Sequence, residues 1–336
     1  MNSILHARYT ARPATMDDAE AVTELMNLVA IDVLGHPTTD VSEALNDWSS
    51  PSCNPATNTR LVFEGARLVG YAGLWIEPPY TVVNGWARVH PEHKRRGIGS
   101  YLASWLAATA RELALPQAPE GARVILHQGR PEADADSRAL LEAQGYLPAR
   151  YFLRMLIELE TPPPAPQLPE PLVLRTFDRD RDLAGLVRAE QAIFRDHWGY
   201  VERDFDHEFE SWEHWMDNDP HHDPSLWFLV MDGEEIAGVC LCTGVRPGEP
   251  DMGYVASLGV QRAWRHRGVG LAMLHHAFGE FYRRGKPRVS LDVDAESLTG
   301  ATRLYEKAGM HVQRRSIEYE LVLREGKDLS TKQLEG

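Results

Sequence analysis

The sequence has little cysteine, few basic residues relative to acidic ones, and no long hydrophobic run. Three cysteines among 336 residues are too few for a disulfide framework, so we interpret them as reduced thiols. No stretch approaches the roughly 18 consecutive apolar residues of a membrane helix, so we expect no membrane partner. The first twenty residues lack a basic segment followed by an apolar core. We therefore expect no secretory signal and a cytoplasmic location.

Acidic residues outnumber basic ones, 49 to 35, which gives a formal net charge of −14. This charge repels polyphosphate backbones, so nucleic acid is not an expected partner, whereas the same field mildly favours a cationic small molecule such as an amine. The hydrophobic content of 43% is typical of a globular protein with a real core. The length suffices for two domains of ordinary size.

An internal repeat sets the domain organisation. Residues 95–110 match residues 266–281 with Gly97 and Gly268 in register, and residues 139–155 parallel residues 303–319. Between the halves lies TPPPAPQLPEP, whose prolines favour an extended linker. We therefore expect an N-terminal domain at 1–160, a linker at 161–171, a C-terminal domain at 172–325 and a polar tail at 326–336.

Each half is predicted to follow the same order of elements. The second half has a tight-turn signal at Asp232–Gly233 between two β-rich runs, which predicts a hairpin over 226–245. Further strands are predicted at 172–177, 254–260, 288–294 and 311–323, and helices at 179–196, 205–218, 268–284 and 298–309. In the first half, residues 60–76 form the hairpin. Hairpins followed by strand–helix–strand units predict an α/β fold: in each domain a mixed, mostly antiparallel twisted sheet with helices on both faces.

The stretch WRHRGVGLAML, residues 264–274, joins a predicted strand to a predicted helix through two glycines. Free backbone N–H groups and the helix dipole at such a junction favour a phosphate. Gly268 and Gly270 let an anion approach the backbone, and Arg265 and Arg267 offer charge-assisted contacts. The dinucleotide fingerprint would need a third glycine where Met273 stands. The first half carries a similar loop, so the sequence predicts phosphate binding twice.

These motifs, together with VDAESLTGATRLYEKAGM at 293–310, resemble the GCN5-related N-acetyltransferase (GNAT) superfamily, and its tandem members in particular. The resemblance covers both halves. It departs from the family pattern at Ser297, where asparagine is usual, and at Met310, where phenylalanine is usual. The resemblance implies acetyl-CoA as co-substrate and direct transfer of its acetyl group to a primary amine of a small molecule. It also implies that the pyrophosphate binds the glycine loop and that the pantetheine arm runs beside the strand ending SLGV.

Site residues follow from the resemblance position by position. The family's general acid, the tyrosine of L-Y-E-K, corresponds to Tyr305, whereas the first half has Leu141 at the matching position. The cofactor-binding residues expected are Leu258, Gly259, Val260, Arg265, His266, Arg267, Gly268, Val269, Gly270, Ser297 and Ala301. A second candidate cofactor site comprises Val89, Lys94, Arg95, Arg96, Gly97, Ile98 and Gly99. The expected substrate residues are Asp196, His197, Trp198, Trp212 and Tyr254.

Three questions stay open in the sequence. The general base is not identified, and Glu249, Asp251, Asp196 and His197 are its candidates. The histidines at 221–222 and 275–276 lack metal-ligand spacing, so we expect no metal site. The principal alternative to an enzyme is a non-catalytic acyl-CoA-binding or ligand-sensing protein that kept the fold, and either would be a monomer or a homodimer.

Overall fold

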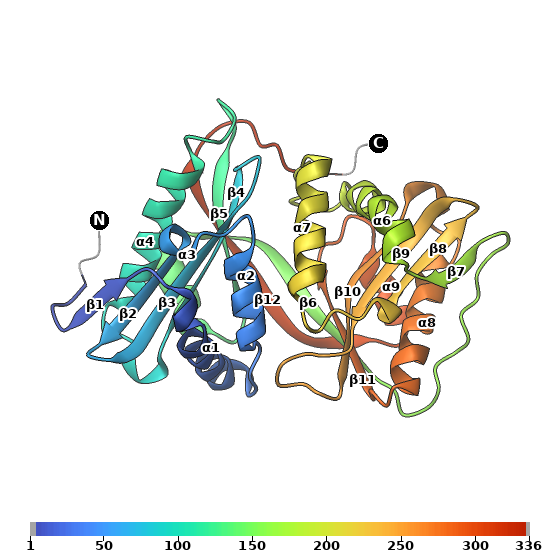
Figure 1. Ribbon diagram of the computed structural model, residues 1–336, viewed down its shortest axis with the longest axis horizontal. Coiled ribbons are helices and arrows are strands. Elements are labelled where there is room, and N and C mark those ends of the chain that lie inside the picture. The colour runs from blue at the N-terminus through green and yellow to red at the C-terminus, as the bar shows by residue number, and fades with distance from the viewer. Residues whose placement is uncertain (1–4, 334–336) are drawn as a thin grey trace. The chain divides into compact units, whose positions relative to one another are not determined.

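The computed structural model describes residues 5–333 and divides the chain into two compact units. Unit 1 contains the chain up to Arg150 together with Ser316–Leu329, and unit 2 contains Tyr151–Arg315 and the segment that begins at Ser330. Each unit is a twisted sheet with helices on both faces (Figure 1). Within the described residues, no helix is long and apolar enough to cross a membrane.

The sheet of unit 1 has the strand order β1-β2-β3-β4-β5-β12. Its strands are β1 (Tyr9–Arg12), β2 (Thr59–Glu64), β3 (Arg67–Ile76), β4 (Val82–Val89), β5 (Val124–Pro131) and β12 (His311–Arg324). Neighbouring strands are antiparallel except β4 and β5, which are parallel. The hairpin expected over 60–76 corresponds to β2 and β3.

The helices of unit 1 divide between the two faces of this sheet. They are η1 (Met16–Asp18), α1 (Ala19–Leu34), α2 (Val41–Ser49), α3 (Pro55–Asn58), η2 (Pro91–His93), α4 (Ile98–Ala114) and α5 (Ala135–Ala143). One hydrophobic cluster joins α4 and α5 to the sheet, with Leu102 and Leu106 fully buried. A second cluster packs α1 and α2 on the sheet around Val22 and Trp48.

Unit 2 repeats the same plan with the strand order β6-β11-β10-β9-β8-β7. Its strands are β6 (Leu147–Glu158), β7 (Val173–Thr176), β8 (Trp227–Asp232), β9 (Glu235–Thr243), β10 (Met252–Val260) and β11 (Arg288–Asp294). Its helices are α6 (Arg179–Phe194), α7 (Phe205–Asn218), η3 (Pro224–Leu226), η4 (Arg262–Trp264), α8 (Val269–Arg283) and α9 (Ala301–Lys307). Helices α8 and α9 pack on one face of the sheet, and α6 and α7 pack on the other. The predicted mixed, mostly antiparallel sheet with helices on both faces is confirmed.

The division into units differs from the contiguous domains expected at 1–160 and 172–325, because the last strand of each half is exchanged. Strand β6, from the first half, pairs with β11 in unit 2 over Phe152–Glu158. Strand β12, from the second half, pairs with β5 in unit 1 from Ser316 onward. The proline-rich segment 161–171 is irregular and belongs to unit 2, where Leu168 packs against the core. Alternating hydrophobicity predicts a strand but does not specify which sheet it joins, so the exchange has no local signal.

Candidate functional site

The sheet of unit 2 opens between its parallel strands β10 and β11. These strands pair from Met252 and Arg288 to Tyr254 and Ser290. Beyond this point a β-bulge lies between Val255 and Ser257, and the rest of β10 pairs with β9. A bulge bends its strand and leaves local backbone groups unpaired. The two strands therefore diverge toward the glycine loop.

A cavity of about 590 Å³ lies at this opening. It is lined by residues 255–260 of β10, residues 291–294 of β11, the glycine loop and the start of α9. Of the predicted cofactor-binding residues, those that line it are Leu258, Gly259, Val260, Arg265, His266, Gly268, Val269, Gly270, Ser297 and Ala301. Arg267 is exposed and is not part of this lining. The structure therefore brings ten of the eleven together.

The two glycines of the loop, Gly268 and Gly270, are required for different structural reasons. Gly268 adopts φ +85°, a left-handed conformation that disfavours side chains, and a Cβ there would meet no atom within 4 Å. At Gly270 a Cβ would lie 2.9 Å from Leu304 Cδ2, so this glycine allows α9 to pack closely on α8. The open space that suits an anion is therefore beside Gly268. Gly259 likewise allows close packing, because a Cβ would lie 2.1 Å from Ile193 Cγ2 on α6.

Arg265 and Asp196 have a structural role that the sequence did not predict. The Arg265 guanidinium lies 2.5 Å from Asp196 and donates to the Val260 carbonyl at 2.9 Å. Asp196 is 2% exposed and also binds Arg262. Hydrogen bonds from Arg262, and then those from Arg265, lower the pKa of Asp196 to about 2 despite its burial. The pair ties the glycine loop to the end of α6, and Arg265 lines the cavity, so the phosphate contact of Arg265 and the acceptor contact of Asp196 stay predictions.

Tyr305 lies on α9 and lines the cavity with 6% of its surface exposed. Among residues 5–333, none forms a hydrogen bond with its hydroxyl group. Burial raises the pKa of Tyr305 above its ordinary value, so the phenol stays protonated at neutral pH. Ser297, just before α9, accepts a hydrogen bond from the Ala301 amide at 3.3 Å and so supports the start of this helix.

The expected substrate residues separate in the structure. His197 and Trp198 line the cavity, and Lys332 Nζ lies 4.3 Å from the Trp198 ring centroid. Burial, and then the charge of Arg265, lowers the pKa of His197, so its ring is neutral at pH 7. Trp212 instead packs against Trp227 in the core on the α6–α7 face.

Tyr254 contributes to a polar cluster beside the cavity, in which Arg154 is buried and Asp292 is exposed. Its hydroxyl donates to Asp292 at 3.1 Å, and Asp292 also accepts from Arg154. Burial opposes ionisation of Asp292, but the bonds from Arg154 hold its pKa below the ordinary value. Two of the candidates for the general base also form ion pairs: Glu249 pairs with Arg154, and Asp251 pairs with Arg288.

Sequence reasoning missed Glu190. This residue of α6 accepts a hydrogen bond of 2.7 Å from the Ser257 hydroxyl, and Ser257 lines the cavity at the bulge of β10. Burial, reinforced by the charge of Glu208, raises the pKa of Glu190 to about 7. The pair is 67 residues apart in sequence, so no local pattern links them.

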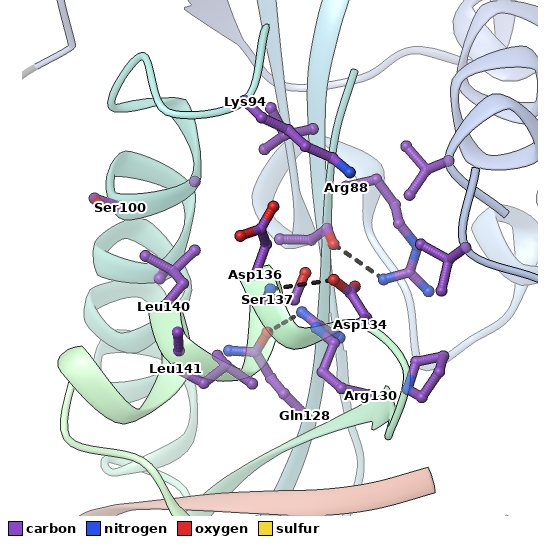
Figure 2. Close-up of a pocket in the computed structure, with 18 of the residues that line it drawn as sticks. Arg88, Lys94, Ser100, Gln128, Arg130, Asp134, Asp136, Ser137, Leu140 and Leu141 are labelled. Carbon is purple, nitrogen blue, oxygen red and sulfur yellow. Dashed lines mark hydrogen bonds between the residues drawn. The ribbon is translucent and has the colours of Figure 1, made fainter. Parts of the chain in front are cut away.

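Unit 1 has a cavity of about 390 Å³ at the corresponding opening between β4 and β5 (Figure 2). Of the second candidate site, Val89, Lys94, Arg95, Gly97 and Gly99 line this cavity, while Arg96 and Ile98 do not. Lys94 pairs with Asp32 of α1 at 2.6 Å, as Arg265 pairs with Asp196 in unit 2. Leu141 lines the cavity at the place of Tyr305.

The histidine clusters have protein partners. His222 contacts the Trp227 ring, and His276 contacts Phe228. In the described part of the chain, one group brings the ligand atoms of three residues within 4.8 Å of one another: His90, Glu92 and His93. The Arg67 guanidinium lies 2.7 Å from His90 Nε2, and Glu64 lies 2.9 Å from His93 Nε2. We assign no metal to this group, because both of these ring nitrogens are already engaged.

The sequence model of the acetyltransferase (GNAT) family matches residues 22–146 and 186–310, once in each half. This chain belongs to the GNAT acetyltransferase family and is an N-acetyltransferase. The resemblance stated from its motifs is confirmed.

Relatives match this chain over most of its length. The mycothiol acetyltransferase of Thermobispora bispora is 31% identical over 256 residues, which are 74% of this chain and 78% of that protein. A GCN5-related N-acetyltransferase from Sphaerobacter thermophilus superposes with a TM-score of 0.79 at 32% identity, covering 98% of this chain and 100% of that one. A tandem GNAT protein from the clavulanic acid biosynthesis pathway agrees in fold, with a TM-score of 0.67 at 17% identity over 95% of this chain and 100% of that one.

The glycine loop offers a matched pair of substitutions. We expect Gly268→Val to raise the KM for acetyl-CoA at least tenfold, because the new side chain would fill the open space beside the α8 N-terminus. Gly97→Val is the control, since Gly97 has the same φ of +85° and equally open surroundings in unit 1. Both variants should lose about 1–2 kcal/mol of stability from backbone strain. Steady-state kinetics and thermal melts measure the two effects, and an equal KM change in both variants would contradict the assignment.

Proposed function

We propose that unit 2 transfers the acetyl group of acetyl-CoA to a primary amine of a small molecule, with Tyr305 as the general acid. The observation that carries this proposal is the Tyr305 hydroxyl. It is protonated, lacks a partner among the described residues, and lines the cavity where β10 and β11 diverge. Family membership supports the transfer chemistry, since GNAT enzymes generally use acetyl-CoA.

The residues at this opening fit acetyl-CoA. The first N–H groups of α8 have no partner inside the helix and point, with the positive end of the helix dipole, toward the space beside Gly268. A pyrophosphate group would bind there. Between the diverging strands, the Leu258 backbone and the Val260 N–H would pair with the amides of a pantetheine arm, while the Val260 carbonyl accepts from Arg265. The thioester of acetyl-CoA supplies an acyl carbon with a thiolate leaving group.

Tyr305 would donate its proton to that thiolate. A hydroxyl that already served as a donor to the protein would have to break that bond first, and Tyr305 has none to break. Leu141 at the matching place of unit 1 carries no exchangeable proton. We therefore assign catalysis to unit 2 and no turnover to unit 1.

The acceptor amine must lose a proton before it attacks. An alkylamine has a pKa near 10.4, so only about one molecule in two thousand is neutral at pH 7. We assign the proton acceptor to Glu190, which acts through the Ser257 hydroxyl at the cavity wall. A carboxyl group with a pKa of about 7 is half ionised at neutral pH, which suits general base catalysis. Asp196 does not suit this role, because its pKa of about 2 makes it a weak base.

The direct test measures CoA release from acetyl-CoA with a panel of primary amines. Deacetylated mycothiol belongs in the panel because relatives of this chain are mycothiol acetyltransferases. We expect at least one amine to stimulate CoA release above the rate of acetyl-CoA hydrolysis, with a stoichiometric N-acetyl product detected by mass spectrometry. Acetyl-CoA binding without stimulation by any amine would support the alternative, a non-catalytic acyl-CoA-binding protein.

A further inference from the structure

The cavity of unit 1 is electropositive inside a strongly acidic protein. Four cationic side chains line it, Arg88, Lys94, Arg95 and Arg130, against two carboxylates, Asp134 and Asp136. The whole chain has the opposite balance, with 49 acidic and 35 basic residues. In the cavity of unit 2 the two signs are equal, with Arg265 and Lys307 against Asp292 and Asp294.

Two of the four cations form ion pairs with carboxylates and two do not. Lys94 pairs with Asp32, and Arg95 pairs with Asp136. Arg88 donates to the Ala87 carbonyl, and Arg130 donates to the Gly129 carbonyl and to Gln128, each of these three bonds measuring 2.7–3.0 Å. Across residues 5–333, no carboxylate forms an ion pair with either of these two arginines. The buried Arg130 Nε has no hydrogen-bond partner.

Figure 2 shows the two guanidinium groups converging on one side of the cavity, near Asp134. Asp134 also caps α5 by accepting from the Ser137 amide, so a single carboxylate serves two cations and a helix end. Glu318 of β12 does not line the cavity, but its negative charge favours the charged form of Arg130. Burial, together with the charge of Arg88, lowers the pKa of Arg130 to about 10, still far above neutrality.

In unit 2, by contrast, a buried arginine has carboxylate partners. Arg154, 3% exposed, binds both Asp292 and Glu249. Arg130 is 5% exposed and has no such partner. Arg130 is buried, Arg88 is half-buried, and Asp134, the lining carboxylate near both, forms an ion pair with neither. Removing a charge from water without a close counter-ion is costly, so this pair of arginines indicates that a ligand supplies the missing anion.

We propose that the cavity of unit 1 binds a small-molecule carboxylate between Arg88 and Arg130. The α4 N-terminus and its glycine loop at residues 94–99 would bind phosphate groups, and Figure 2 shows the two guanidinium groups apart from Lys94 of that loop. A carboxylate between the arginines would therefore not occupy the phosphate position. Two guanidinium groups match the two oxygens of a carboxylate with charge-assisted bonds. The carboxylate belongs either to a free dicarboxylate or to the end of a carboxyacyl-CoA. This inference does not depend on catalysis in unit 2.

The test uses the full-length chain, isothermal titration calorimetry and thermal melts. The probes are succinate, the neutral succinamide, inorganic phosphate, and succinyl-CoA and acetyl-CoA in parallel. We expect saturable binding of succinate or succinyl-CoA, and no binding of succinamide. If the free acid binds, the source is a dicarboxylate. If succinyl-CoA binds at least tenfold more tightly than acetyl-CoA and the free acid does not bind, the source is a carboxyacyl-CoA.

Variants R88M and R130M should each weaken carboxylate binding at least tenfold, because each removes one charge-assisted contact and keeps the length of the side chain. Their unliganded melting temperatures should fall less than that of R154M, since neither Arg88 nor Arg130 forms a direct ion pair with a protein carboxylate, whereas Arg154 forms two. R154M in unit 2 is the structural contrast and should melt lower, and R111M on the outside of α4 controls for net charge. The proposal is overturned if phosphate binds and the carboxylates do not, if no carboxylate binds, or if R88M and R130M bind like R111M.

Discussion

Tyr305→Phe is expected to lower kcat about 10²-fold or more while the acetyl-CoA KM and the melting temperature barely change. This factor is the usual size of a lost general acid. The hydroxyl has no hydrogen-bond partner among the described residues, so its removal leaves no buried group unsatisfied, and the ring still packs in the core. Steady-state kinetics and calorimetric melts on the two proteins measure these quantities.

Tyr146→Phe is the matched control. Tyr146 is a buried tyrosine of unit 1 whose hydroxyl accepts from Gln128 Nε2 at 2.7 Å. Its removal should cost about 1 kcal/mol of stability and leave kcat unchanged, the reverse of the Tyr305 result. Near-full kcat in Tyr305→Phe, with product release shown not to be rate-limiting, would exclude Tyr305 as the acid.

Glu190→Gln is expected to lower kcat/KM about 10²-fold at pH 8 and to remove one limb of the pH profile. In the wild-type enzyme activity should rise with pH through about 7, because the ionised carboxyl is the base. The glutamine keeps the bond to Ser257 but titrates nowhere in this range. A pH series of initial rates at saturating acetyl-CoA checks both statements.

The melting temperature of Glu190→Gln distinguishes a catalytic role of Glu190 from a purely structural one. The pKa of Glu190 in the fold is raised above that of an unfolded glutamate, about 4.3, so the group favours folding at low pH and this contribution is lost as pH rises through about 7. Glu190→Gln should therefore melt no lower than the wild type at pH 8. The exposed pair Glu202–Arg195 provides a control in Glu202→Gln, which should change neither quantity. If the pH limb persists in Glu190→Gln and disappears in His197→Gln, the base is His197.

The sequence predicted the elements of the fold well, because local rules control them. The hairpin around Asp232–Gly233 lies where its turn signal predicts, with Gly233 at φ +59°, and the strand expected at 288–294 is β11. Residues of the glycine loop and Tyr305 gather at one cavity, because the repeat gave their register. These features depend on spacing along the chain, which a sequence records directly.

Features that depend on distant contacts were not predicted. Charge next to a glycine loop suggested phosphate binding for Arg265, but the position of Asp196 at the end of α6 determines where that side chain points. Glu190 looks like any polar helix residue until β10 places Ser257 against it. The unpaired Arg88 and Arg130 are also invisible in the sequence, since only the fold shows which carboxylates lie out of reach.

The exchanged strand β12 has a consequence for biosynthesis. Strand β5 of unit 1 lacks its neighbour until residues 316–324 leave the ribosome, and all of residues 151–315 are made in between. At about 5–20 residues per second, this interval lasts roughly ten to thirty seconds. During that time the nascent chain presents an open β-edge, the kind of surface that recruits wrong strands. Completion of unit 1 is thus timed by the synthesis of residues 316–324, and a ribosome that stalls before them leaves both units unfinished.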